Sequence, residues 1–179
     1  AGFIFLRLRG ILGKKSGFEE DITQSFPHEF PNVKPVKKTN FDVFDDKAKS
    51  EFLSGAKIAY ETIITDFSNG NLKNIKNILE KKVLKQFEDA ISERKKQGNI
   101  SETTFIGINS AEIKQHERNG NFLEVTVDFV SEIISCVKDK DSKIISGDPE
   151  KVKKVYDTWK FSKNVQSNDP NWSLIETNV

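Results

Sequence analysis

The sequence has few of the residues that build metal, redox or disulfide chemistry. Its 179 residues include one cysteine, Cys136, two histidines and no methionine. A single cysteine has no second thiol in the chain with which to form a disulfide. There are no cysteine pairs, and His28 and His116 lie far apart in the sequence, so a zinc site is not expected. We therefore expect no metal site and no cofactor.

Long apolar runs are also missing. The uncharged stretch that opens the sequence, residues 1–6, is far shorter than the ~20 residues of a membrane-spanning helix. It is followed by basic residues of the kind that remain on the cytoplasmic side of a membrane helix. These are Arg7, Arg9, Lys14 and Lys15. On the residues alone, two interpretations are open. Residues 1–15 are either the end of a membrane anchor that begins further upstream, or a short amphipathic terminus.

Neither sign of charge dominates the chain. It holds 28 basic and 27 acidic residues, and without the four basic residues near the start the remainder holds 24 basic against 27 acidic. A nucleic-acid-binding domain carries a clear excess of lysine and arginine, because phosphate contacts supply most of its affinity. We therefore expect no nucleic-acid partner for the folded part.

Residues 16–45 contain no sustained helix or strand pattern. Pro27, Pro31 and Pro35 interrupt every candidate helix, which predicts a linker. This linker has more aromatic residues than a spacer requires. They are Phe18, Phe26, Phe30, Phe41 and Phe44. Two interpretations are open here as well: the linker docks on a partner or on its own domain, or it is a tether with incidental aromatic residues.

Helical periodicity begins after the linker. Apolar residues at spacings of three and four predict a helix over residues 46–67, and Asp45 and Asp46 suit its N-terminus. A short helix over residues 72–78 and a longer one over residues 80–97 are expected next. Gly98 closes the last of these helices.

After Gly98 the pattern changes to the alternation of strands. Ile106 and Ile108 share one parity, whereas Ala111 and Ile113 share the other, which predicts a bulge near residues 109–110. Three later stretches are expected to turn the chain. They are Asn119-Gly120, Gly147-Asp148-Pro149 and residues 168–171. We expect an α+β domain over residues 46–179, whose helices pack into the concave side of a curved antiparallel sheet.

The apolar face of the predicted sheet includes one carboxylate. Asp157 shares its parity with Val155, Trp159 and Phe161. A buried carboxylate can serve as a general base, but it more often accepts hydrogen bonds that fix a neighbouring element. His116 has no partner residue that suggests catalysis, and we expect no catalytic residues.

A set of aromatic and small residues is the candidate pocket. Such a set lines a cavity only if the helix stands off the sheet, and otherwise it forms the core. Both alternatives are open. The candidate pocket consists of Phe52, Ala56, Tyr60, Phe87, Asp157, Trp159 and Trp172.

Five blocks of the sequence, in order, resemble the Tim44-like domain family over about residues 46–179. The family includes the mitochondrial inner-membrane protein that tethers the import motor, and alphaproteobacterial relatives. The blocks are FLSGAKIAYE at residues 52–61, the helix with Ala90, Ile91, Glu93 and Arg94, GDP at residues 147–149, DTWKF at residues 157–161 and SNDPNW at residues 167–172. The resemblance implies a cone-shaped α+β fold of the nuclear transport factor two-like or cystatin-like kind.

The resemblance also implies a function. Bacterial members begin with a single membrane helix that ends in a sequence like AGFIFLRLRGILGKK, so residues 1–15 are expected to be the end of an N-terminal anchor. The domain is then expected on the cytoplasmic or matrix side of an inner membrane, as a non-enzymatic adaptor. Its expected partner is a protein, such as a translocase or membrane-protein component. Anionic membrane lipid is a further possible partner, because the mitochondrial relative contacts acidic lipids and has a hydrophobic pocket proposed for lipid.

Two alternatives stand beside the adaptor. One is a small-molecule-binding or isomerase-like enzyme that uses Asp157 inside the cone. The other is self-association through the outer sheet face, where four residues share an exposed parity. These residues are Val130, Tyr156, Thr158 and Ile175.

A run of lysines, Lys151, Lys153 and Lys154, could add attraction to anionic lipid.

Overall fold

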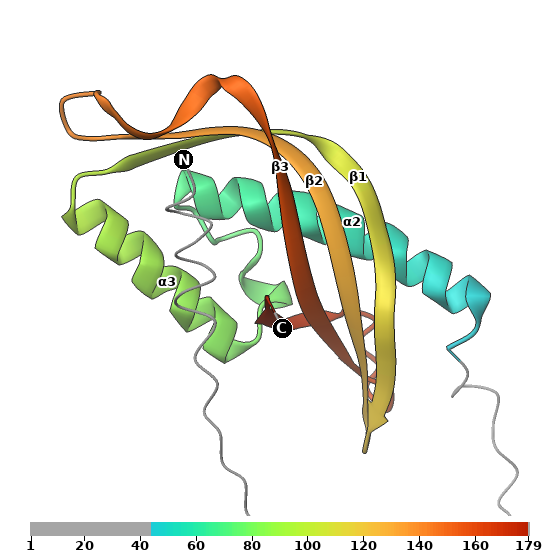
Figure 1. The fold of residues 1–179 in the computed structure, drawn as a ribbon. Coiled ribbons are helices and arrows are strands. Elements are labelled where there is room, and N and C mark those ends of the chain that lie inside the picture. The colour runs from blue at the N-terminus through green and yellow to red at the C-terminus, as the bar shows by residue number, and fades with distance from the viewer. Residues whose placement is uncertain (1–43, 179) are drawn as a thin grey trace, which may run out of the picture.

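A computed structural model describes residues 44–178, so the basic residues near the start of the chain lie outside the described part. The described chain forms helices first and a four-stranded sheet afterwards (Figure 1). The elements are α2 (Asp46–Asn69), the 3-10 helix η1 (Lys76–Ile78), α3 (Lys81–Lys96), β1 (Ile100–Asn119), β2 (Phe122–Lys138), β3 (Ile144–Asn164) and β4 (Ser173–Thr177). This confirms the predicted α+β class.

The first helix follows its prediction closely. The Asp45 side chain accepts a hydrogen bond from the Ala48 backbone N–H at 2.8 Å, which caps the N-terminus of α2. The helix ends at Gly70, whose φ of 70° places it in the left-handed region that glycine adopts most easily. Residues at helical spacing, among them Phe52, Ala56 and Tyr60, are buried on the face that meets the sheet.

The next two helices agree with the sequence only in part. The helix expected over residues 72–78 is wrong in its first turn, because only η1 at Lys76–Ile78 is helical. By contrast, α3 begins where it was expected, capped by Glu80, whose side chain accepts from the Lys82 N–H at 2.8 Å. Arg94 donates from Nη2 to the Phe67 carbonyl at 3.1 Å and so ties the end of α3 to the end of α2.

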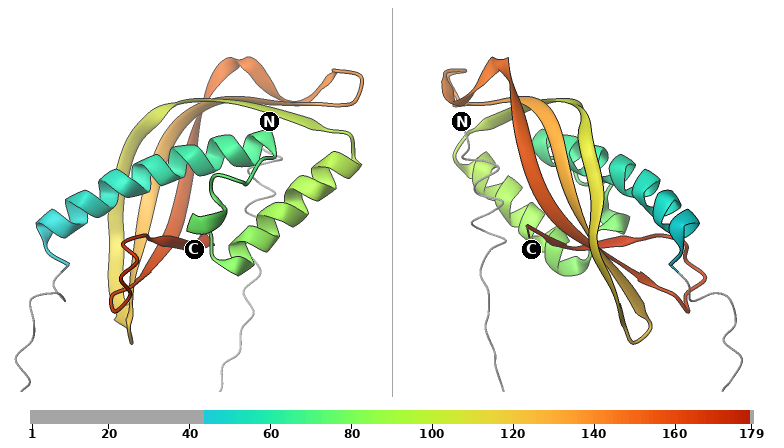
Figure 2. Two further views of the ribbon diagram at one scale, coloured as in Figure 1. Left: turned by 180° about the vertical axis from the view of Figure 1, so that it is seen from behind. Right: turned by 45° about the vertical axis from the view of Figure 1, so that its right-hand side comes forward.

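The sheet is fully antiparallel, in the order β1-β2-β3-β4. The pairing of β1 with β2 shifts register three times, at Ile106, Asn109 and Lys114. The bulge expected near residues 109–110 is confirmed. The prediction that Ile106 and Ile108 lie on the same face of the strand is wrong. The bulge at Ile106 leaves its side chain 50% exposed, while Phe105 and Ile108 pack against the core. Bulges bend a strand and increase its twist, which fits the curved sheet seen in Figure 2.

The turn expected at Gly147-Asp148-Pro149 is also wrong. β3 runs without interruption from Ile144 to Asn164. In its pairing with β2, Ile134 faces Val152 and the next residue, Ser135, faces Asp148, so residues 149–151 form a bulge. Gly147 has a φ of 80°, and a Cβ there would lie 2.8 Å from the Cys136 Cα and closer still to the Ser135 carbonyl oxygen. The glycine therefore serves close packing of two strands, not a change of direction.

The core lies between α2 and the concave face of the sheet. α2 crosses that face, and α3, η1 and β4 lie together at one side of it (Figure 2). The fully buried residues include Tyr60 on α2 and Phe129 on β2, whose rings stack at 4.3 Å. This packing covers the C-terminal half of α2 with side chains from the sheet, α3 and β4. The N-terminal half is covered less completely.

Candidate functional site

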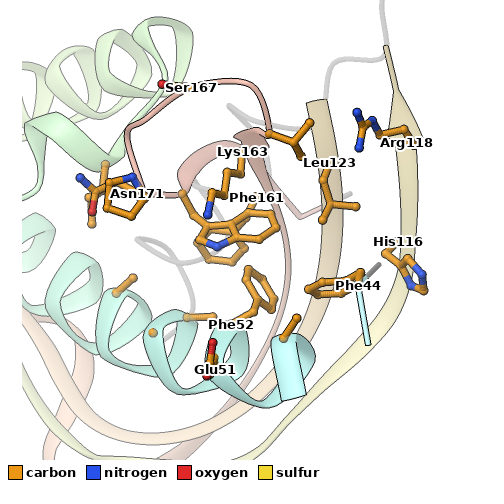
Figure 3. A pocket seen from close by; sticks show the side chains of 18 of the residues that line it. Phe44, Glu51, Phe52, His116, Arg118, Leu123, Phe161, Lys163, Ser167 and Asn171 are labelled. Carbon is orange, nitrogen blue, oxygen red and sulfur yellow. The ribbon is translucent and has the colours of Figure 1, made fainter. Parts of the chain in front are cut away.

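An open pocket lies beside the N-terminal half of α2 (Figure 3). Its volume is about 1310 Å³, larger than the ordinary ligand pocket of about 300–1,000 Å³. Its walls come from four parts of the chain: α2, the β1–β2 hairpin, the end of β3 and the segment that leads into β4. Among its lining residues are Phe44, Ala48, Glu51, Phe52, Gly55, Ala56, Ala59, His116, Glu117, Arg118, Leu123, Phe161, Lys163, Asn171 and Trp172.

The floor of the pocket is aromatic. The Phe52 ring lies 4.5 Å from the Trp172 ring and 5.7 Å from the Phe161 ring, measured between centroids. Trp172 reaches this position from the turn expected at residues 168–171, in which the Asp169 carboxylate accepts from the Asn171 N–H at 2.9 Å. Edge-to-face and tilted ring pairs of this kind accept further apolar or aromatic groups readily.

Small residues of α2 form one wall. Ala48, Gly55 and Ala59 line the pocket, and a Cβ built on Gly55 would meet no other atom within 4 Å. A glycine in a helix interior costs about 0.5–1 kcal/mol relative to alanine. No described residue lies close enough to exclude a larger side chain at position 55. The absence of a side chain there leaves the adjacent part of the pocket open.

The rim carries charges of both signs. Glu117 accepts a hydrogen bond from Lys160 Nζ at 3.3 Å, and Arg118 Nε donates to the Gly120 carbonyl at 2.7 Å. Burial alone would lower the pKa of Lys160, but its bonds to Glu117 and Glu124 outweigh that effect and the pKa is raised. Lys163 extends from the end of β3 into the pocket (Figure 3). The arrangement suits a ligand with an apolar body and polar edges.

A buried polar network lies deeper in the domain. The Tyr60 hydroxyl donates to Asp157 Oδ2 at 2.7 Å and lies 2.9 Å from Ser131 Oγ. Burial and the negative charge of Asp157 raise the pKa of the Tyr60 hydroxyl well above its usual range. A void that Asp157 lines measures about 10 Å³, scarcely one water molecule. The network ties α2 to β2 and β3, and this void is too small for a substrate.

A model of the Tim44-like domain family matches residues 44–179. The chain belongs to this family. The comparison with curated proteins gives no match. Among solved structures, the chain is similar to the intermembrane space region of the chloroplast protein ARC6, with 16% identity and a TM-score of 0.43. That similarity covers 74% of this chain and 95% of the other.

The Tim44-like domain divides the seven candidate pocket residues into two groups. Phe52, Ala56 and Trp172 line the open pocket. The other four, Tyr60, Phe87, Asp157 and Trp159, do not line it. Exposure does not separate the two groups, because Phe52 and Ala56 are also buried, at 5% and 4%. Helical spacing placed Phe52, Ala56, Tyr60 and Phe87 on inward faces, and strand parity did so for Asp157, Trp159 and Trp172, but neither showed which of these residues border a cavity.

Several pocket residues were missed by the sequence reasoning. Gly55 carried a usable signal, because it is a glycine in the interior of a long helix, at the edge of its apolar stripe. His116 was considered only as a catalytic residue, yet it lies 5.2 Å from the Phe44 ring, again measured between centroids. Leu123 and Lys163 gave no signal, since only the curvature of the sheet brings them to the helix.

Other candidate features lie elsewhere on the Tim44-like domain. Lys151 and Lys154 are exposed on β3, and Tyr156 is 62% exposed on the outer face. Within residues 44–178, no helix is long and apolar enough to cross a membrane.

A second groove of about 740 Å³ has an apolar floor and four lysines in its lining. Its lining includes Leu72, Leu84, Ile91, Lys73, Lys76, Lys95 and Lys96.

Proposed function

We propose that the chain is a non-enzymatic adaptor tethered to an inner membrane. Residues 1–15 hold the chain at the membrane, residues 16–45 form the linker, and the Tim44-like domain receives an apolar segment of a protein partner. The observation that carries this proposal is the open aromatic pocket of about 1310 Å³. Tethering would raise the effective concentration of the domain at the membrane, so the partner is held there without chemical change.

The rim of the pocket favours a peptide over a lipid headgroup. An anionic headgroup is best held by basic residues alone, whereas the lining of this pocket includes Glu51 and Glu117 as well as Arg118 and Lys163. A peptide segment presents apolar side chains together with donors and acceptors of both kinds, which suits an aromatic floor with a mixed rim. The proposed ligand is therefore a protein segment with one or more large apolar side chains.

The enzyme alternative gains no support from residues 44–178. It required an open cavity with Asp157 at its base, but Asp157 is only 9% exposed and accepts a hydrogen bond from Tyr60. The open pocket lies elsewhere, and Asp157 does not line it. Self-association through the outer sheet face remains a prediction, which a measurement of molecular mass at micromolar concentration would test.

The test is flotation with two kinds of vesicle of the same lipid composition, with and without native inner-membrane proteins. The samples are the full chain, a chain of residues 44–179, and the shorter chain with Gly55→Leu. The Ser54→Leu variant is the matched control, because it adds the same side chain to an exposed position next to the pocket wall. We expect the full chain to float with both vesicles.

The shorter chain is expected to float only with vesicles that contain proteins. Gly55→Leu should abolish that binding, while Ser54→Leu should preserve it. Equal flotation of the shorter chain with both kinds of vesicle would instead identify a lipid-binding domain, for which the groove lined by four lysines is the place to mutate. If neither chain floats with either vesicle, the adaptor proposal is refuted.

A further inference from the structure

We propose that the pocket has an internal occupant, namely residues 26–31 of the same chain, with the sequence FPHEFP. In this arrangement the linker folds back onto the domain, Phe26 and Phe30 enter the pocket, and a partner must displace them. The proposal goes beyond the adaptor function, since it concerns the state of the protein without a membrane or a partner.

The first argument is the position of Phe44. This residue precedes α2, and its ring already lies against pocket residues, 6.0 Å from Phe52, 5.2 Å from His116 and 6.2 Å from Trp172 between centroids. The described part of the chain therefore starts inside the pocket, with an aromatic side chain from the end of the linker in place. The upstream chain leaves from this same point.

The second argument is the space that remains. With Phe44 in place the pocket still has a volume of about 1310 Å³, and the open space above Gly55 belongs to it. Of the three floor rings, Phe52 and Phe161 are nearly buried, while Trp172 is partly exposed and offers its indole to an edge-to-face contact with a further phenylalanine ring. Room and chemistry are thus available for more side chains of the type that Phe44 contributes.

The third argument is the sequence upstream. Phe26-Pro27 and Phe30-Pro31 repeat the same dipeptide, and a proline favours an extended backbone for the residue before it. A segment restricted in this way loses less conformational entropy when it docks. Between the two pairs lies Glu29, whose charge is opposite to that of Lys163 on the rim. The rim carries two basic residues, Arg118 and Lys163, beside the acidic Glu51 and Glu117, so Glu29 has basic partners available at the side of the pocket formed by the sheet.

The fourth argument is reach. Phe44 lies fourteen positions after Phe30, with thirteen residues between them, and an extended chain spans up to about 3.3 Å per step, so roughly 46 Å of chain is available. Because the chain departs from within the pocket, this length is ample for a return. A tethered segment with a short linker has an effective concentration in the millimolar range, so even a weak contact would be populated.

The test reads the solvent access of Trp172 in the full chain, without lipid. Acrylamide quenching of fluorescence reports on this residue, because the other tryptophan, Trp159, is only 3% exposed. A Trp172→Phe variant gives the Trp159 background. The test variant carries Phe26→Ser and Phe30→Ser, and the control variant carries Phe18→Ser and Phe41→Ser, the same change elsewhere in the linker. None of the four positions lies within the described domain, so its core packing is unaltered.

We expect the test variant to show a steeper quenching of Trp172 than the unaltered chain, while the control variant matches the unaltered chain. In a Gly55→Leu background the same pair of serine substitutions should change the quenching less, because the leucine side chain obstructs part of the space that the segment would occupy. Equal quenching in the test variant and the unaltered chain overturns the proposal, as does an equal effect of the two serine pairs. Neither result affects partner docking, which the vesicle experiment tests separately.

Discussion

The hydroxyl of Tyr60 is predicted to be a main polar tie between the long helix and the sheet, and Tyr60→Phe tests this. The substitution removes one oxygen atom and leaves the ring that stacks on Phe129 at 4.3 Å. It deletes the 2.7 Å hydrogen bond to Asp157 and the 2.9 Å contact with Ser131. Both partners are buried, so water does not easily replace the lost hydroxyl.

The magnitude follows from the kind of bond. A hydrogen bond to a charged group contributes about 1.5–3 kcal/mol, and one between neutral groups contributes about 1 kcal/mol. Tyr60→Phe should therefore lower the free energy of unfolding by about 3 kcal/mol at pH 8. The matched control is Tyr156→Phe, the same chemical change at a side chain that is 62% exposed, for which we expect a change within about 0.5 kcal/mol.

The effect should also depend on pH in one direction. The pKa of the folded Tyr60 hydroxyl is raised by burial and by the negative charge of Asp157, whereas an unfolded tyrosine titrates near pH 10. Below pH 10 both states keep the proton, so the contribution is complete. Above pH 10 only the unfolded state loses it, and the unaltered protein loses about 1.4 kcal/mol per pH unit from this residue. The cost of Tyr60→Phe should thus fall by roughly half at pH 11.

The assay is urea unfolding of both variants and the unaltered protein at pH 8, 10 and 11, followed by tryptophan fluorescence. The dependence on urea should stay the same, so that differences in midpoint report stability. The reasoning is refuted if Tyr60→Phe costs less than about 0.5 kcal/mol at pH 8, or if a larger cost does not change between pH 8 and pH 11.

Three further predictions concern the backbone, and urea unfolding measures each. Gly147→Ala should lower the free energy of unfolding by about 2–4 kcal/mol, because the φ of residue 147 is 80° and the new Cβ would overlap the Ser135 backbone. The control is Gly107→Ala, which should change the free energy of unfolding by less than about 1 kcal/mol, because a Cβ at residue 107 meets nothing within 4 Å. Equal effects of these two substitutions would contradict the bulge described here. Gly55→Ala should stabilise by about 0.5–1 kcal/mol, and a loss of stability would mean that the helix wall is tighter than described. Asp45→Ala should cost about 1 kcal/mol through the lost cap on α2, and no cost would show that the cap is dispensable.

The sequence predicted the elements whose signals are local. Caps and a glycine stop defined α2, and Asn119-Gly120 defined the first hairpin, because each of these acts within a few residues of the chain. The bulge at Ile106 escaped detection because a single extra residue reverses parity without any mark in the composition. Gly147-Asp148-Pro149 predicts a turn because a glycine next to Asp-Pro is typical of turns, while the actual role of Gly147 depends on its close approach to β2, the neighbouring strand.

The site was harder to predict than the fold for a related reason. Alternation and helical spacing identify the face on which Phe52, Tyr60 and Trp159 lie, but they do not show whether another element covers that face. All three are buried, but Phe52 also lines the open pocket, whereas Tyr60 and Trp159 do not. That difference depends on where α3 and β4 end along α2, which only the packed chain determines.

The domain therefore separates stability from binding along one helix. The C-terminal half of α2 holds Tyr60 and Phe67 against the sheet and α3, and substitutions there should lower the free energy of unfolding. The N-terminal half presents Ala48 and Gly55 to an open pocket, so side chains added there should block a ligand and leave the core intact. A core variant that lost partner binding while remaining fully folded, or a pocket variant that unfolded, would show that the two halves are not independent. Because Gly55→Ala is expected to stabilise the helix while Gly55→Leu is expected to block the pocket, the two substitutions at this one residue distinguish the halves most directly.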